Sequence, residues 1–114
     1  MIRVNIYGTG SDGNLSLLDD SLTAIMIDCG LNTKIIKDVS IYNRLKACII
    51  THEHKDHSKY KDKIAEITDI ITDCTTKKID NFEITTVEAF HNIKNIAAYI
   101  YNKADDINIM WATD

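Results

Sequence analysis

The stretch from Leu22 to Ile27 is almost continuously apolar, and this feature constrains the fold more than any other in the sequence. A strand with apolar residues at nearly every position is typical of a sheet that is covered on both faces. A second short apolar run, from Ala47 to Ile50, has the same character. We therefore expect a sheet whose central strands are buried on both sides.

Other segments alternate apolar and polar residues or form short apolar runs, and both patterns favour strands. We predict these further strands at residues 2–7, 15–18, 70–72, 82–89, 96–101 and 107–111. Helical segments are predicted at 34–37, with Asn32 or Thr33 as N-cap, at 40–46, and at 58–67, with Ile64 and Ile67 facing inward. A strand-rich chain with a few short helices on one side of a mixed sheet is typical of an α+β or α/β fold.

A length of 114 residues, of which 45% are apolar, is typical of one compact globular domain. The formal net charge of -4 argues against a broad basic face for nucleic acid. There is no signal-peptide pattern and no apolar run long enough for a membrane span, so we expect a cytoplasmic protein without membrane contact. Three widely spaced cysteines, Cys29, Cys48 and Cys74, predict reduced and mostly buried thiols rather than a disulfide framework.

Five potential metal ligands lie within the six residues from His52 to His57, directly after the predicted buried strand at 47–50. Imidazole and carboxylate groups are natural ligands for zinc, iron or manganese. His52 and His54 are two residues apart, so in an extended segment their rings point the same way and can share one metal. Asp56 and His57 come at the turn into the next helix and can reach a second metal, about 3.5–4 Å from the first.

The histidines of the chain are concentrated in this run, which holds three of the four. The fourth, His91, follows the predicted strand at 82–89. An isolated H-x-H pair is a weak signal, whereas the full H-x-H-x-D-H run after a buried strand is a strong one. The sequence therefore predicts a metal site.

The run Thr51-His52-Glu53-His54-Lys55-Asp56-His57 resembles the metal motif of the metallo-β-lactamase superfamily. A second likeness is Gly8-Thr9-Gly10-Ser11-Asp12-Gly13-Asn14, followed by Ile25-Met26-Ile27-Asp28-Cys29-Gly30-Leu31. Together they resemble the small bacterial and phage branch described as exonucleases, related to ribonuclease Z and other phosphodiesterases. The resemblance covers nearly the whole chain and implies an α+β fold of the αββα type.

The resemblance also implies two metal sites joined by one bridging carboxylate. The implied ligands, in chain order, are His52, His54, Asp56, His57, His91 and Asp114. The first site is matched by His52, His54 and His91. The second site is matched by Asp56 and His57, and the bridge by Asp114.

Three residues have further implied roles. Asp56 is expected to act as the catalytic residue, by orienting the attacking water or accepting its proton. Asp28 and Thr51 are expected to support the metal loop without touching the metal. Glu53 and Lys55 are expected to point away from the metals.

The family continues beyond the position of Asp114 into a second αβ half, which supplies a last histidine to the second metal. We therefore expect residues 1–114 to form a single, truncated metallo-β-lactamase-like domain that lacks this half. The chain is then a fragment of a longer protein, a degenerate gene product, or a half-domain completed by a partner or by homo-oligomerisation. An uncovered apolar sheet face would favour self-association.

The function implied is that of a metal-dependent hydrolase, a phosphodiesterase or nuclease that uses a metal-activated water. The expected cofactor is zinc, as one or two ions, with manganese or iron as alternatives. The expected substrate is a phosphodiester or a small nucleotide. Two alternatives stay open: a thioester or lactone hydrolase on the same fold, and a non-catalytic metal-binding remnant or assembly subunit.

Overall fold

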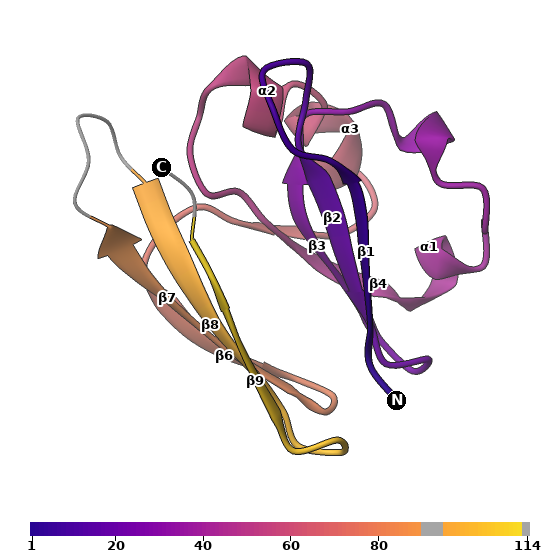
Figure 1. Ribbon diagram of the computed structural model, residues 1–114, viewed down its shortest axis with the longest axis vertical. Coiled ribbons are helices and arrows are strands. Elements are labelled where there is room, and N and C mark those ends of the chain that lie inside the picture. Colours follow the sequence, from indigo (N-terminus) through magenta and orange to yellow (C-terminus); the bar gives the residue numbers. More distant parts are fainter. Residues whose placement is uncertain (90–94, 113–114) are drawn as a thin grey trace.

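Two β-sheets and a layer of short helices make up the computed structural model, which describes residues 1–89 and 95–112. The helices lie against one face of the first sheet, and the second sheet packs against its other face (Figure 1). The layers are therefore helices, sheet and sheet. This arrangement confirms the expected α+β class.

The first sheet consists of β1 (Arg3–Gly8), β2 (Leu15–Asp19), β3 (Ala24–Cys29), β4 (Leu45–Ile49) and β5 (Asp69–Ile71), in that order. β1, β2 and β3 are antiparallel neighbours, whereas β3, β4 and β5 are parallel. Side chains of β3 alternate between two cores: Met26 packs beneath the helices and Ile25 packs against the second sheet. Both faces are buried, which explains the continuous apolar run.

The second sheet is an antiparallel meander of β6 (Thr75–Ile79), β7 (Phe82–Ala89), β8 (Asn95–Asn102) and β9 (Ile107–Trp111). Its inner face carries the core residues Phe82, Ile84 and Ile100. Its outer face exposes Val87, Tyr99 and Met110. Within the described residues no helix covers this outer face (Figure 1).

The helices are short: the 3-10 helix η1 (Thr33–Ile35), α1 (Ile41–Arg44), α2 (Lys55–Ser58) and α3 (Lys61–Ala65). The Asn32 side chain caps η1 by accepting a hydrogen bond from the backbone N–H of Lys34, as expected of an N-cap residue.

The prediction of one helix over residues 58–67 is wrong. The backbone N–H of Tyr60 donates to the carbonyl of Cys29 in β3, 2.9 Å away, and this contact separates α2 from α3. Ile64 is buried as expected, but α3 ends at Ala65 and leaves Ile67 54% exposed.

The third strand begins at Ala24, two residues later than predicted. The Asp20 side chain accepts hydrogen bonds from the backbone N–H groups of Leu22 and Thr23, at 3.0 and 2.7 Å. Ser21 has a φ of 76°, which is typical of a tight turn. Leu22 therefore belongs to the turn and is 58% exposed.

Cys29 and Cys48 are buried and Cys74 is exposed, and all three are free thiols. In the described ranges, no helix has the length and apolar character needed to span a membrane.

Asp19 at the end of β2 forms an ion pair with Arg44 of α1. The guanidinium donates two hydrogen bonds to the carboxylate, from Nη2 at 2.7 Å and from Nε at 3.2 Å. Burial alone would raise the pKa of Asp19, but the hydrogen bonds from Arg44 and Ser21 outweigh it and lower the pKa below its ordinary value. A carboxyl group with a lowered native pKa stabilises the fold above its unfolded value of about 3.9, and this contribution is lost as the pH falls through the native pKa.

We therefore expect Asp19→Asn to lower the free energy of unfolding by about 2 kcal/mol at neutral pH. The difference from the unmodified protein is expected to shrink as the pH falls from the unfolded value of about 3.9 through the native pKa, where Asp19 becomes protonated. Urea unfolding over a series of pH values measures it. Asp12→Asn, at an exposed loop position, is the control for a change in net charge. A difference that stays constant with pH would contradict this account of the ion pair.

Candidate metal centre

The metal motif begins where β4 leaves the first sheet. The carbonyl of Thr51 accepts a hydrogen bond from the backbone N–H of Ile96 in β8, at 2.8 Å, and His52 forms an isolated β-bridge with Asn95. The second sheet thus holds the backbone of the exit from β4. Two residues later, His54 has extended backbone angles and serves as the N-cap residue of α2.

His52, His54 and Asp56 form one compact group of potential ligands. One ligand atom from each lies within 4.8 Å of the others, and the two imidazole centroids are 5.0 Å apart. Ligand atoms on one tetrahedral zinc ion are roughly 3.3 Å apart, so small side-chain movements would bring these three groups onto one ion. His52 is buried, Asp56 is half-buried and His54 is exposed, so the group opens to solvent.

Asp56 joins the two histidines because of where α2 begins. From the sequence, Asp56 is predicted to reach a second metal, with the helix beginning after His57. The helix instead begins at Lys55, so the chain turns immediately after His54. The carboxylate of Asp56 consequently lies beside the imidazoles of His52 and His54.

His57 lies next to this group, and a contact with Asp28 fixes the orientation of its ring. Its Nδ1 is 2.6 Å from Oδ2 of Asp28, and its Nε2 is 3.6 Å from Oδ2 of Asp56. Its ring centroid is 3.7 Å from that of His52. In the neutral form of the ring, an Nδ1–H that donates to this carboxylate leaves Nε2 as the nitrogen with a lone pair directed at the site.

Asp28 at the end of β3 connects the metal loop to the sheet. Its carboxylate accepts hydrogen bonds from the backbone N–H of Thr51 at 2.8 Å and from the Thr51 hydroxyl at 2.9 Å, in addition to the contact with His57. Asp28 has a φ of 62°, a left-handed conformation that aspartate tolerates better than most residues. These contacts are the ones that a supporting role for Asp28 and Thr51 requires.

The two buried imidazoles have opposite electrostatic environments. Burial, together with the charge of neighbouring His57, lowers the pKa of His52 below its ordinary value. Burial alone would also lower the pKa of His57, but the hydrogen bond and negative charge of Asp28 outweigh it and raise that pKa. His52 is therefore neutral at neutral pH, as a metal ligand must be.

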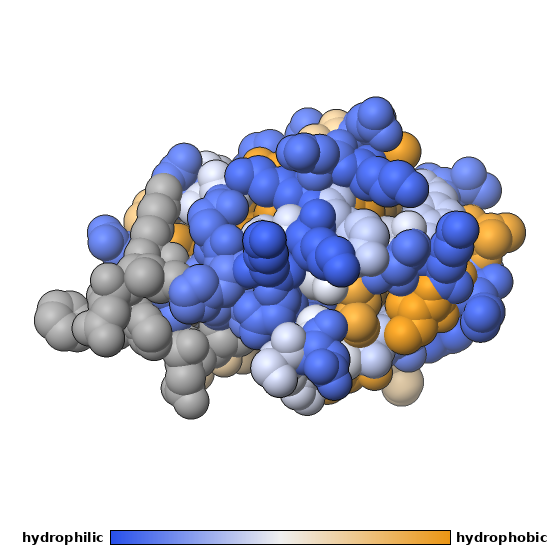
Figure 2. All heavy atoms as spheres, turned by 90° about the horizontal axis from the view of Figure 1, so that it is seen from above, coloured by the Kyte–Doolittle hydropathy of each residue, from blue (hydrophilic) through white to orange (hydrophobic). Residues whose placement is uncertain are grey.

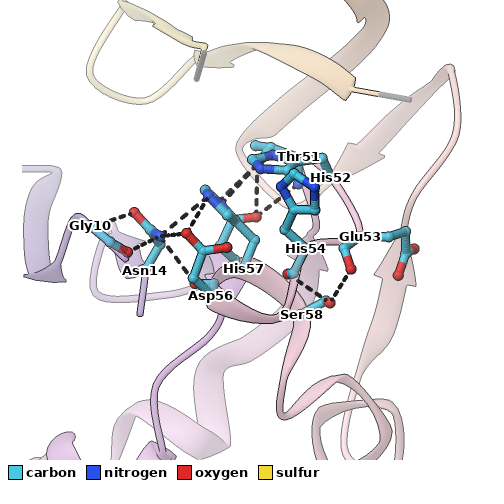
Figure 3. A network of polar contacts seen from close by, with 10 residues as sticks. Gly10, Asn14, Thr51, His52, Glu53, His54, Asp56, His57 and Ser58 are labelled. Carbon is cyan, nitrogen blue, oxygen red and sulfur yellow. Dashed lines mark hydrogen bonds and ion pairs between the residues drawn. The ribbon is translucent and has the colours of Figure 1, made fainter. Parts of the chain in front are cut away.

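The remaining residues of the motif and the more distant predicted ligands lie as follows. Glu53 is exposed, pairs with Lys61 at 3.2 Å, and is directed away from the imidazoles (Figure 3). Lys55 is exposed in the first turn of α2. His91 and Asp114 lie outside the described residues, so their predicted roles as ligands stay predictions.

A cavity of about 570 Å³ adjoins the site. Its lining includes the loop residues Gly8–Ser11 and the side chains of Asp28, Asp56, His57 and Trp111. Seen from the end of the molecule that carries α2 and this loop, the surface is mainly hydrophilic (Figure 2). Half-buried Asp56 is therefore open to this cavity, whereas His57 is buried at its wall.

Two residues at the site have roles that the sequence reasoning did not assign. Asn14, at the end of the glycine-rich loop, contacts both Asp56 and His57 through its amide nitrogen (Figure 3). Gly30 lets the backbone of Asp56 approach β3 closely. The only signal in the sequence was the density of Gly, Asn and Asp in these two loops, which indicates turns but not their contacts.

No protein-family model matches this sequence, and no curated protein matches it. Solved structures do match its fold. YhfI from Bacillus subtilis, a metallo-β-lactamase fold protein, has 14% identity and a TM-score of 0.73 over 99% of this chain and 62% of its own. The short form of human tRNase Z has 15% identity and a TM-score of 0.69 over 100% of this chain and 69% of its own.

A third similar structure comes from Thermotoga maritima and is assigned as a zinc-dependent hydrolase of the metallo-β-lactamase superfamily. It has 16% identity and a TM-score of 0.60 over 98% of this chain and 50% of its own. This chain thus spans 62% of YhfI and half of the Thermotoga protein. At such low identities the likeness shows a shared fold.

Proposed function

We propose that this chain, which has the metallo-β-lactamase fold, acts as a metal-dependent hydrolase of phosphodiesters. The observation that carries the proposal is the group of His52, His54 and Asp56 beside the cavity that Asp56 also lines. Two imidazoles and one carboxylate are a donor set found in catalytic zinc sites, where three protein ligands leave one position free. A bound zinc ion supplies a Lewis acid and lowers the pKa of a coordinated water towards about 7.

The side chains around this group are suited to hold a cation in one place. His52 is kept neutral by its surroundings, so its ring nitrogen retains a lone pair at neutral pH. Asp28 ties Thr51 and His57 to the end of β3, which fixes the loop that carries the ligands. In this proposal Asp56, half-buried at the cavity wall, accepts a proton from an attacking water.

Phosphodiesters are the substrate class that the observations favour. A cavity of about 570 Å³ is of the size that binds small molecules such as a nucleotide. The short form of human tRNase Z, a nuclease by its name, shares the fold. The net charge of -4 provides no broad basic surface for a long duplex, which favours a small nucleotide or the end of a strand.

The test begins with metal-free protein that is reloaded with Zn²⁺ or Mn²⁺ and assayed on bis(p-nitrophenyl) phosphate. We expect bound metal by elemental analysis and metal-dependent release of p-nitrophenol. His54→Ala removes one of the three ligands, so we expect it to lower both metal affinity and the rate by at least about 100-fold.

Glu53→Gln is the matched control, because Glu53 lies within the same motif but faces away from the ligand group. It should retain metal and activity. Metal binding without turnover would favour a non-catalytic metal-binding protein, and turnover of a thioester or lactone probe alone would favour another class of hydrolase. Protein that takes up no metal would refute the proposal.

A further inference from the structure

The side chain of Asn14 extends from the glycine-rich loop towards Asp56 and His57 (Figure 3). Its Nδ2 lies 3.3 Å from Nε2 of His57 and 3.5 Å from Oδ2 of Asp56. The same nitrogen lies 3.1 Å from the backbone carbonyl of Asp56. The amide group thus faces two groups that the sequence analysis predicted as ligands of a second metal.

The orientation of this amide is set by Gly10. The backbone N–H of Gly10 donates to Oδ1 of Asn14 at 3.1 Å, and Nδ2 of Asn14 donates to the Gly10 carbonyl at 2.9 Å. Rotating the amide by half a turn would place a donor against a donor and an acceptor against an acceptor. The NH₂ group therefore points at Asp56 and His57.

An NH₂ group in this position does electrostatically what a cation would do. In the neutral form of His57, Nδ1–H donates to Asp28 and Nε2 presents a lone pair, while Asp56 presents a carboxylate oxygen 3.6 Å from that nitrogen. One hydrogen of Nδ2 is donated to the Gly10 carbonyl, and both acceptors lie near the other, which they share with the backbone carbonyl of Asp56 at 3.1 Å. A cation bound between the same two acceptors would have to displace this amide.

We infer that Asn14 is a positioning residue whose amide stands in for a second cation, so that the chain binds one cation tightly, at His52, His54 and Asp56. This inference rests on the proposed function, since it requires a cation at that group. It predicts that the chemical nature of residue 14 decides how many cations bind. Replacing the amide by a carboxylate turns a competing donor into a third acceptor beside Asp56 and His57.

The test is a titration of chelator-stripped protein with Zn²⁺ by calorimetry, with elemental analysis after gel filtration. We expect the unmodified protein to hold one Zn²⁺ tightly and Asn14→Asp to hold two. Asn14→Ala removes the competing donor without adding a ligand, and it should tighten the second, weaker binding step by at least about tenfold. Asn32→Asp is the matched control, because aspartate serves equally well as the N-cap of η1.

Binding of two equally tight Zn²⁺ ions by the unmodified protein would overturn the inference, as would a single ion in Asn14→Asp. Circular dichroism checks that each variant folds; if Asn14→Asp does not, the second binding step of Asn14→Ala decides, and an unchanged affinity overturns the inference. The readout needs no catalysis, so one bound Zn²⁺ without hydrolysis leaves this inference standing while the proposed hydrolase fails. Protein that binds no Zn²⁺ refutes both.

Discussion

Gly30→Ala is expected to abolish tight cation binding and to lower the free energy of unfolding by about 3 kcal/mol or more. A β-carbon at Gly30 would lie 1.7 Å from the carbonyl oxygen of Asp56 and 2.3 Å from its carbonyl carbon. Both are backbone atoms, so no side-chain rotation relieves the overlap. The start of α2 must move away from β3, and Asp56 moves with it; a shift of about 1 Å is enough to disable a catalytic site.

The measurements are urea unfolding of the metal-free protein and calorimetric titration with Zn²⁺. Gly10→Ala is the matched control, because a β-carbon there meets no atom within 4 Å. It makes the same chemical change in a neighbouring loop and should leave both quantities nearly unchanged. A Gly30→Ala protein that binds Zn²⁺ like the unmodified chain would mean that α2 does not need its close approach to β3.

The close approach at Gly30 illustrates what the sequence does and does not reveal. The strands β3 and β4 were predictable because burial on both faces requires apolar residues at every position. Strand β6, Thr75–Ile79, was missed because it is polar and forms by pairing with β7 at the edge of its sheet. Local patterns report burial, whereas an edge strand depends on a partner.

The candidate site likewise combines features that local sequence patterns predict with features that depend on distant contacts. The residue types and their place after β4 follow from the order of residues, so a group of potential ligands around His52 and His54 was predictable. That Asp56 joins them depends on the helix beginning at Lys55, and helix boundaries are poorly defined by sequence. The contact of Asn14 with Asp56 joins positions 42 residues apart, and no local pattern contains it.

The second large effect is expected at Asp28, which is predicted from the sequence to support the metal loop. In Asp28→Asn, one oxygen still accepts the backbone N–H of Thr51, but the amide nitrogen that replaces the other oxygen cannot accept the Nδ1–H of His57. Two donors then face each other in a buried site, and His57 must rotate or change tautomer. We expect cation affinity to fall by about 10- to 100-fold, the usual effect of losing a residue that supports metal ligands.

Asp28→Ala is expected to destabilise the fold more, because it leaves the Thr51 N–H and the His57 ring without their buried acceptor. We expect the free energy of unfolding to fall by about 3–5 kcal/mol. Asp106→Asn is the control, since Asp106 also has a positive φ, of 53°, but lies at an exposed turn far along the chain. Calorimetric titration with Zn²⁺ and urea unfolding separate the two effects. Unchanged affinity in Asp28→Asn would show that the orientation of His57 does not govern how the loop holds its cation.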